Sequence, residues 1–138
     1  MPRHVTPALA VDVIIELVDQ PGRPIVVVMR RHPPSGCAIP GGFVNIGETV
    51  EQAARREARE ETGLEVTLGE LLGIYSDPRR DPRGHSVSLV YLATATGQPV
   101  AGDDAAGVLV VNPRVGPQVV FDHRSILDDY LRRIEFRS

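Results

Sequence analysis

The chain has 138 residues, of which 42% are hydrophobic and 24% are charged. This length is enough for a single domain, residues 1–138, with one hydrophobic core, and the composition is that of a globular rather than a disordered protein. The net charge of −3 provides no overall basic field that would gather nucleic acid.

The sequence gives no sign of a membrane or a secreted protein. No apolar run approaches the roughly 20 residues needed to cross a bilayer, and Met1-Pro-Arg-His4 is not followed by the apolar stretch of a signal peptide. The single cysteine, Cys37, has no partner for an internal disulfide. We therefore expect a cytoplasmic protein.

The hydrophobic pattern predicts strands separated by two helices. Strands are expected at residues 9–18, 25–29, 64–75, 85–95 and 108–111. Helices are expected at about residues 50–62 and 123–133, with Asp122 as the N-cap of the second. Strands mixed with two separated helices predict an α/β fold, in which helices cover a mixed sheet.

The first helix has clear start and stop signals. Thr49-Val-Glu-Gln52 is a capping-box pattern, and Gly63 is suited to end the helix in a left-handed conformation. At 100° per residue, one face carries small apolar residues together with Glu57, Glu60 and Glu61. The opposite face carries Gln52, Arg55, Arg59 and Thr62.

Three carboxylates on a packed face repel one another and lose hydration. Oxygen ligands at helical spacing suit a hard divalent cation, Mg²⁺ or Mn²⁺, which would compensate their charge. The alternative is a solvated charged face, which is the commoner arrangement of charge runs on helices.

The residues around this helix resemble the Nudix box, G-x5-E-x7-R-E-U-x-E-E-x-G-U. Gly42, Glu48 and the segment 56–64 occupy every required position, with Ala58 as a small residue at the aliphatic site. The resemblance implies a Nudix-type α/β/α sandwich with a mixed sheet and a loop–helix–loop catalytic motif. It also implies hydrolysis of a nucleoside diphosphate linked to another group, X.

The resemblance assigns roles to individual residues. It implies that Glu57, Glu60, Glu61 and the carbonyl of Gly41 bind the metal, and that Arg56 and Glu48 orient this cluster. In this family the general base is sometimes a box glutamate and sometimes a residue on a distant loop. Asp103 and Asp104 are candidates for that base, or else form an ordinary Gly-Asp turn.

Three further segments, 75–91, 102–105 and 121–123, resemble short ADP-ribose pyrophosphatases. This resemblance implies Mg²⁺-dependent hydrolysis of ADP-ribose to AMP and ribose 5-phosphate, and a homodimer. One alternative is a pyrophosphohydrolase that clears oxidised or non-standard nucleoside triphosphates. Another is a non-catalytic domain that senses ADP-ribose.

The loop around residues 79–85 offers groups that could bind such a substrate. Arginine forks suit phosphates, and an aromatic ring could stack on adenine. The candidate substrate-binding residues are Arg79, Arg80, Arg83, His85 and Phe43. The alternatives are a solvated loop for the arginines, a structural role for the histidine and core packing for the phenylalanine.

Overall fold

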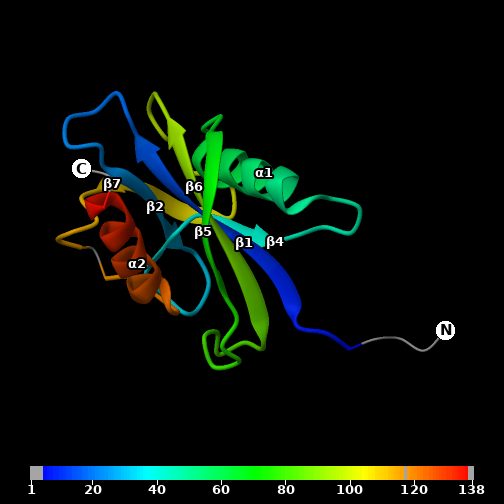
Figure 1. Cartoon of the computed structure of the whole chain (residues 1–138). Helices are drawn as coiled ribbons and strands as arrows, with labels where there is room; N and C mark the ends of the chain where they lie inside the picture. The colour runs from blue at the N-terminus through cyan, green and yellow to red at the C-terminus, as the bar shows by residue number, and fades with distance from the viewer. Residues whose placement is uncertain (1–4, 117, 137–138) are drawn as a thin grey trace.

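The computed structural model describes residues 5–116 and 118–136 (Figure 1). Its strands are β1 (Ala8–Leu17), β2 (Ile25–Arg30), β3 (Cys37–Ala38), β4 (Gly41–Phe43), β5 (Thr67–Tyr75), β6 (Ser86–Ala95) and β7 (Ala105–Val111). Its helices are α1 (Val50–Thr62) and α2 (His123–Glu135). The short strands β3 and β4 lie where the sequence predicted only a loop, and Met1-Pro-Arg-His4 lies outside the described residues.

The strands form one mixed sheet in the order β3-β2-β1-β6-β5, with β4 paired to β1 and β7 to β2. β1 runs parallel to β6, and the other pairings are antiparallel. Within the β1–β4 pairing, Asp12 stands opposite Gly41. This register brings β4, which leads into the loop before α1, onto the middle of the sheet.

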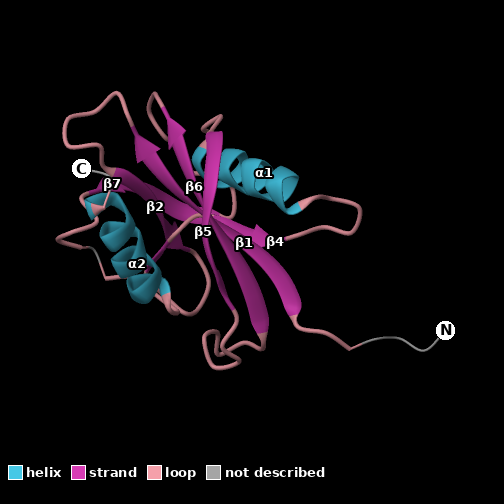
Figure 2. Ribbon diagram, viewed as in Figure 1, coloured by secondary structure: helices cyan, strands magenta, loops and turns pink. Residues whose placement is uncertain are grey.

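The two helices cover opposite faces of the sheet (Figure 2). Side chains of β1 alternate between the two faces, as the pleat of a strand requires. Val11, Val13 and Ile15 belong to the core under the alanines of α1, whereas Ile14 belongs to the core under α2. The α/β/α sandwich with a mixed sheet, expected from the sequence, is confirmed. In the described ranges, no helix is long and apolar enough to span a bilayer.

The predicted signals at both ends of α1 are present. Gln52 N–H donates to Thr49 Oγ1 at 3.0 Å, and Thr49 N–H donates to Gln52 Oε1 at 2.9 Å. Gly63 has a φ of 72°, and its N–H donates to Arg59 O. The expectation that Thr62 faces solvent is wrong, because it is fully buried and its hydroxyl donates to Ala58 O at 2.6 Å.

Asp122 precedes α2 as predicted, but its side chain does not cap the helix. Both of its carboxylate oxygens accept hydrogen bonds from Arg80, at 2.8 and 2.9 Å. This ion pair ties the β5–β6 loop to the beginning of α2. It therefore fixes one wall of the cavity described below.

Candidate active site

Two glutamates one helical turn apart form an acidic centre at the C-terminal half of α1. Glu61 Oε2 accepts a hydrogen bond from Gly41 N–H at 3.3 Å. Burial and the neighbouring Glu57 charge raise the pKa of Glu61 to about 8. Burial also raises the pKa of Glu57, although the Arg56 guanidinium opposes this shift. Both carboxylates are therefore poorly hydrated, and each favours its protonated form more than an exposed glutamate does.

The glycines of β4 leave room for this centre. A Cβ atom on Gly42 would lie 2.5 Å from the Glu57 carboxyl group, and one on Gly41 would overlap Asp12. Neither glycine has a positive φ. The requirement at both positions is therefore space rather than backbone conformation.

Arg56 organises the outer side of the acidic centre. Its guanidinium donates to Glu48 at 2.6 and 2.9 Å and to Glu57 at 2.7 Å. It also donates to Glu60 at 3.1 Å and to the carbonyl of Phe43 at 3.0 Å. The bonds from Arg56 lower the pKa of Glu48 to about 2. One guanidinium thus joins the motif loop to α1 and stabilises Glu48 in its charged form.

The expectation that all three glutamates face the packed side of α1 is wrong for Glu60. Its side chain is 55% exposed and turns toward Arg56. Across the described ranges, no three His, Cys, Asp or Glu side chains converge closely enough to hold a metal ion. The pair Glu57 and Glu61 nevertheless fits a hard divalent cation, because both offer carboxylate oxygens at helical spacing, where burial raises the pKa of each and the Glu57 charge adds to the shift at Glu61.

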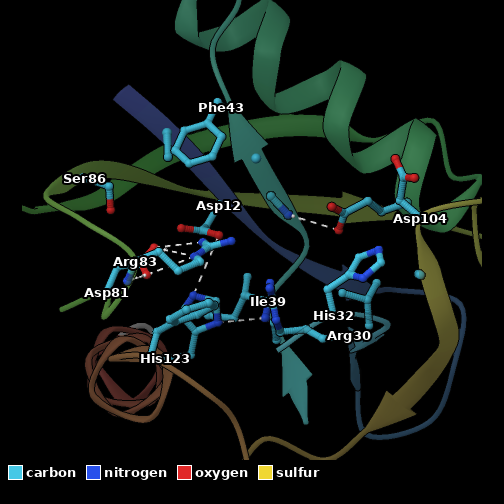
Figure 3. A pocket seen from close by; sticks show the side chains of 18 of the residues that line it. Asp12, Arg30, His32, Ile39, Phe43, Asp81, Arg83, Ser86, Asp104 and His123 are labelled. Carbon is cyan, nitrogen blue, oxygen red and sulfur yellow. Dashed lines mark hydrogen bonds and ion pairs between the residues drawn. The ribbon is translucent and has the colours of Figure 1, made fainter. Parts of the chain in front are cut away.

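A cavity of about 230 Å³ opens beside the acidic centre, between β4, the end of β2, the β5–β6 loop and the start of α2 (Figure 3). Glu61, Gly41 and Gly42 lie on its wall. Its other charged lining residues, of both signs, are Asp12, Arg30, Arg31, Arg80, Asp81, Arg83 and Asp104. The cavity can therefore hold a ligand that carries both anionic and hydroxyl groups.

Some of the substrate-binding residues expected from the sequence lie at this cavity. Phe43 and Arg83 line it, and so does Asp104, the candidate base. Arg80 also lines it, but its side chain is only 6% exposed and is held by Asp122 and by Ser86 Oγ. Arg80 therefore shapes the wall and has little freedom to reach a ligand.

Arg79 and His85 are not among the residues that line the cavity. The Arg79 side chain is 91% exposed and pairs with Asp77. The ring of His85 contacts the carbonyl of Ser76 at 3.0 Å. Both side chains therefore contact other residues of the β5–β6 loop rather than the cavity.

The cavity also contains Arg30, which the sequence did not single out as a ligand-binding residue. The guanidinium carbons of Arg30 and Arg83 each lie 5.0 Å from the centre of the Phe121 ring. Burial and the nearby Arg83 charge lower the pKa of Arg30, so the two cations repel one another. Arg83 is also paired with Asp81 at 2.8 Å but is 48% exposed, so Arg30 and Arg83 together bring positive charge to the cavity that Glu61 lines.

A second unforeseen pair, Asp12 and His123, lies at the floor of the cavity. Asp12 accepts a hydrogen bond from Ser88, and His123 Nδ1 accepts one from Ile39 N–H at 3.0 Å. Burial lowers the pKa of His123. The available sequence signals were an aspartate among the apolar residues of β1 for Asp12 and the family-like segment 121–123 for His123, but nothing local joined the two.

Comparisons with known proteins agree with this geometry. Residues 6–129 match the model of the NUDIX domain. An ADP-ribose pyrophosphatase from Methanocaldococcus jannaschii is 44% identical over 131 residues, covering 94% of this chain and 76% of the relative. The ADPR responsive transcriptional repressor NtrR of Acinetobacter baylyi is 28% identical and aligns with 96% of this chain, but this alignment spans only 56% of the repressor.

A solved structure of a MutT/nudix family protein from Enterococcus faecalis has the same fold. It superposes with a TM-score of 0.81 at 27% sequence identity, covering 98% of this chain and 65% of that one. The domain match covers most of the chain and includes the acidic helix and both β4 glycines. The chain belongs to the NUDIX family, as its Glu57–Glu61 helix and the resemblance of its sequence indicated.

Proposed function

We propose that this protein hydrolyses the pyrophosphate bond of ADP-ribose, or of a similar nucleoside diphosphate linked to X, in the presence of Mg²⁺ or Mn²⁺. The products from ADP-ribose are AMP and ribose 5-phosphate. One observation carries the proposal: Glu61, one helical turn from Glu57, lines a cavity that also presents Arg30 and Arg83. The 44% identity to an ADP-ribose pyrophosphatase supports this substrate.

In this proposal Glu57, Glu61 and the carbonyl of Gly41 hold the divalent cation, and Glu60 joins them by turning away from Arg56. When bound, the cation would supply positive charge that neutralises the pyrophosphate and Lewis acidity that activates the attacking water. Arg56, fixed by Glu48, positions Glu57 through its 2.7 Å hydrogen bond. Arg56 and Glu48 are therefore positioning residues.

The remaining residues bind the substrate and move a proton. Arg83 and Arg30 bind phosphate oxygens through guanidinium N–H groups. Phe43, half-exposed at the cavity, stacks against the base. Asp104 accepts the proton of the attacking water, whose oxygen bonds to one phosphorus as the bridging P–O bond breaks. Arg79, Arg80 and His85 are left out of this assignment because their side chains are exposed away from the cavity or held by other groups.

The test is a product screen with purified protein and Mg²⁺ on ADP-ribose, NADH, ADP-glucose, diadenosine polyphosphates and an oxidised guanine triphosphate. We expect AMP from ADP-ribose, with a kcat/KM at least about tenfold above the others, which corresponds to about 1.4 kcal/mol of discrimination. Pyrophosphate released mainly from the triphosphate would favour a nucleotide-pool enzyme instead. Glu57→Gln and Glu61→Gln serve as inactive controls.

A second function, sensing of ADP-ribose without turnover, is favoured by the similarity to the NtrR repressor. It predicts binding of ADP-ribose with no AMP released in Mg²⁺ or Mn²⁺. The same screen therefore separates the two functions when it is combined with calorimetry. The homodimer and the cytoplasmic location stay predictions, and light scattering of the purified protein tests the first.

A further inference from the structure

The floor of the cavity pairs a carboxylate with an imidazole from distant parts of the chain. Asp12 lies on β1 and points to the α2 side of the sheet, and His123 is the first residue of α2. The two residues are only 8% and 3% exposed, yet both line the cavity (Figure 3). Nothing in the proposed chemistry at Glu57 and Glu61 uses this pair.

Each of the two side chains has one polar atom occupied and one free. Asp12 Oδ2 accepts the hydrogen bond from Ser88 Oγ, which leaves Oδ1. His123 Nδ1 accepts from Ile39 N–H, so the neutral ring carries its proton on Nε2. Nε2 and Oδ1 are 3.8 Å apart, which is too far for a hydrogen bond between them.

These two free atoms are open to the cavity. Among the described residues, every fully buried side-chain nitrogen or oxygen has a hydrogen-bond partner. Since Asp12 Oδ1 and His123 Nε2 have no hydrogen bond to the described chain, they must reach the cavity surface. A ligand atom can therefore bond to both.

The chemistry of the pair selects a hydroxyl group. A hydroxyl about 2.8 Å from both atoms can donate to Oδ1 and accept from Nε2–H at the same time. The Asp12 charge repels an anion, and a C–H group satisfies neither atom. A neutral sugar hydroxyl is the group in ADP-ribose that meets both requirements.

We propose that Asp12 and His123 bind a ribose hydroxyl of the substrate, so that the enzyme prefers ribose over deoxyribose at that position. This inference rests on the proposed function and deepens it. Asp12 stands opposite Gly41, whose N–H bonds to Glu61, so the sugar lies beside the candidate metal site.

Calorimetry without divalent metal tests the proposal, because no turnover occurs. The ligands are ADP-ribose and the analogues that each lack one ribose hydroxyl. We expect the wild-type protein to bind one analogue at least about tenfold more weakly than ADP-ribose, as expected when a buried polar pair loses its partner. In Asp12→Asn, which keeps an oxygen for Ser88 but turns N–H groups toward Nε2–H, this preference disappears.

His123→Asn provides a second variant in case Asp12→Asn disturbs the fold. It keeps an acceptor for Ile39 N–H, removes the Nε2 donor and loses the same preference. Asp81→Asn is the matched control, because Asp81 lines the cavity but is already paired with Arg83. Whatever Asp81→Asn does to overall affinity, it leaves the ratio between ADP-ribose and each analogue unchanged.

The possible failures are distinct. If the wild-type protein binds ADP-ribose and all the deoxy analogues equally, or if a folded Asp12→Asn keeps the preference, the hydroxyl site is wrong and the proposed function stands. If the wild-type protein neither binds ADP-ribose nor releases AMP from it in Mg²⁺ or Mn²⁺, the proposed function fails and takes the hydroxyl site with it. If AMP is released without measurable binding in the absence of metal, the ratio of kcat/KM between ADP-ribose and each analogue replaces the ratio of affinities. Circular dichroism of each variant confirms that a folded protein is compared.

Discussion

Gly42 lies so close to Glu57 that any side chain at residue 42 would occupy the space of the glutamate carboxylate. A Cβ atom there would be 2.5 Å from the carboxyl carbon. The backbone of β4 and the acidic face of α1 are therefore in direct contact. The position of Glu57 depends on a residue fifteen places earlier that has no functional group of its own.

We predict that Gly42→Ala lowers kcat strongly while the protein stays folded. The added methyl group must push the Glu57 carboxylate aside, and a displacement of about 1 Å at a reacting centre can cost roughly a hundredfold in rate. Gly73→Ala on β5 is the control, because its Cβ would make only an ordinary 3.4 Å contact with Tyr75. Equal kcat values for the two variants would show that the close contact has no functional importance.

Glu61 should make metal binding depend on pH. Its pKa of about 8 means that below this pH a divalent cation must displace a proton from the carboxyl group. The rise in Tm produced by Mg²⁺ is therefore expected to be larger at pH 9 than at pH 7, as measured by thermal unfolding at both pH values. In Glu61→Gln the rise in Tm produced by Mg²⁺ should be small at both pH values. A wild-type rise in Tm that becomes smaller from pH 7 to pH 9 would contradict the assignment of Glu61 as a metal ligand.

His123 should make the folded state less stable in mild acid. Burial holds the pKa of His123 in the folded protein below its ordinary value, which applies in the unfolded chain. At a pH between these two values, the unfolded chain binds more protons than the folded protein, and the free energy of unfolding therefore rises with pH. The contribution of His123 is present above about pH 6.5 and is lost, by up to about 1.4 kcal/mol per pH unit, as the pH falls below it. Urea unfolding of the wild type and of His123→Asn between pH 5 and about 8 measures the difference.

The comparison with His123→Asn separates this effect from that of Glu61. The raised pKa of Glu61 acts with the opposite sign, because the folded protein binds the proton more tightly and loses stability as the pH rises. Both proteins share the Glu61 contribution. A stability difference between them that stays constant with pH would contradict the role given to the histidine.

The Arg80–Asp122 pair is expected to contribute strongly to stability. Asp122→Ala leaves a buried guanidinium without its two hydrogen bonds, which we expect to cost about 2–4 kcal/mol of unfolding free energy. Asp128→Ala breaks the exposed pair with Arg124 in α2 and should cost at most about 1 kcal/mol. Denaturant unfolding of the two variants compares their losses of unfolding free energy. Similar losses would show that burial of Arg80 adds nothing to the contribution of its ion pair to stability.

The features of the site that the sequence predicted are the local ones. The bounds of α1, its capping box and its terminal glycine all depend on residues within a few positions of one another. The error at Glu60 is also instructive, because an ideal helical angle places it near Glu57 and Glu61. The side chain instead turns outward to Arg56 one turn earlier in the chain.

The features that the sequence did not predict join distant segments. Ser88 and Asp12 are 76 residues apart, and Ile39 and His123 are 84 residues apart. No periodicity or short motif connects such positions, since only the pairing of β1 with β6 and the docking of α2 bring them together. The approach of Arg30 and Arg83 to the Phe121 ring has the same origin. Arg83 was expected to bind substrate, but its placement beside Arg30 depends on the fold.

The segment that carries Asp104 is attached to α1 through backbone atoms. Val100 N–H donates to Thr62 O at 2.7 Å, and Gly102 N–H donates to Glu61 O at 3.2 Å. A side chain on Gly102 would collide with the carbonyl of Glu60. The identities of residues 103 and 104 play no part in these bonds. Evolution or design can therefore exchange the residues at the tip of this loop, the proposed base Asp104 among them, while the acidic helix keeps its geometry.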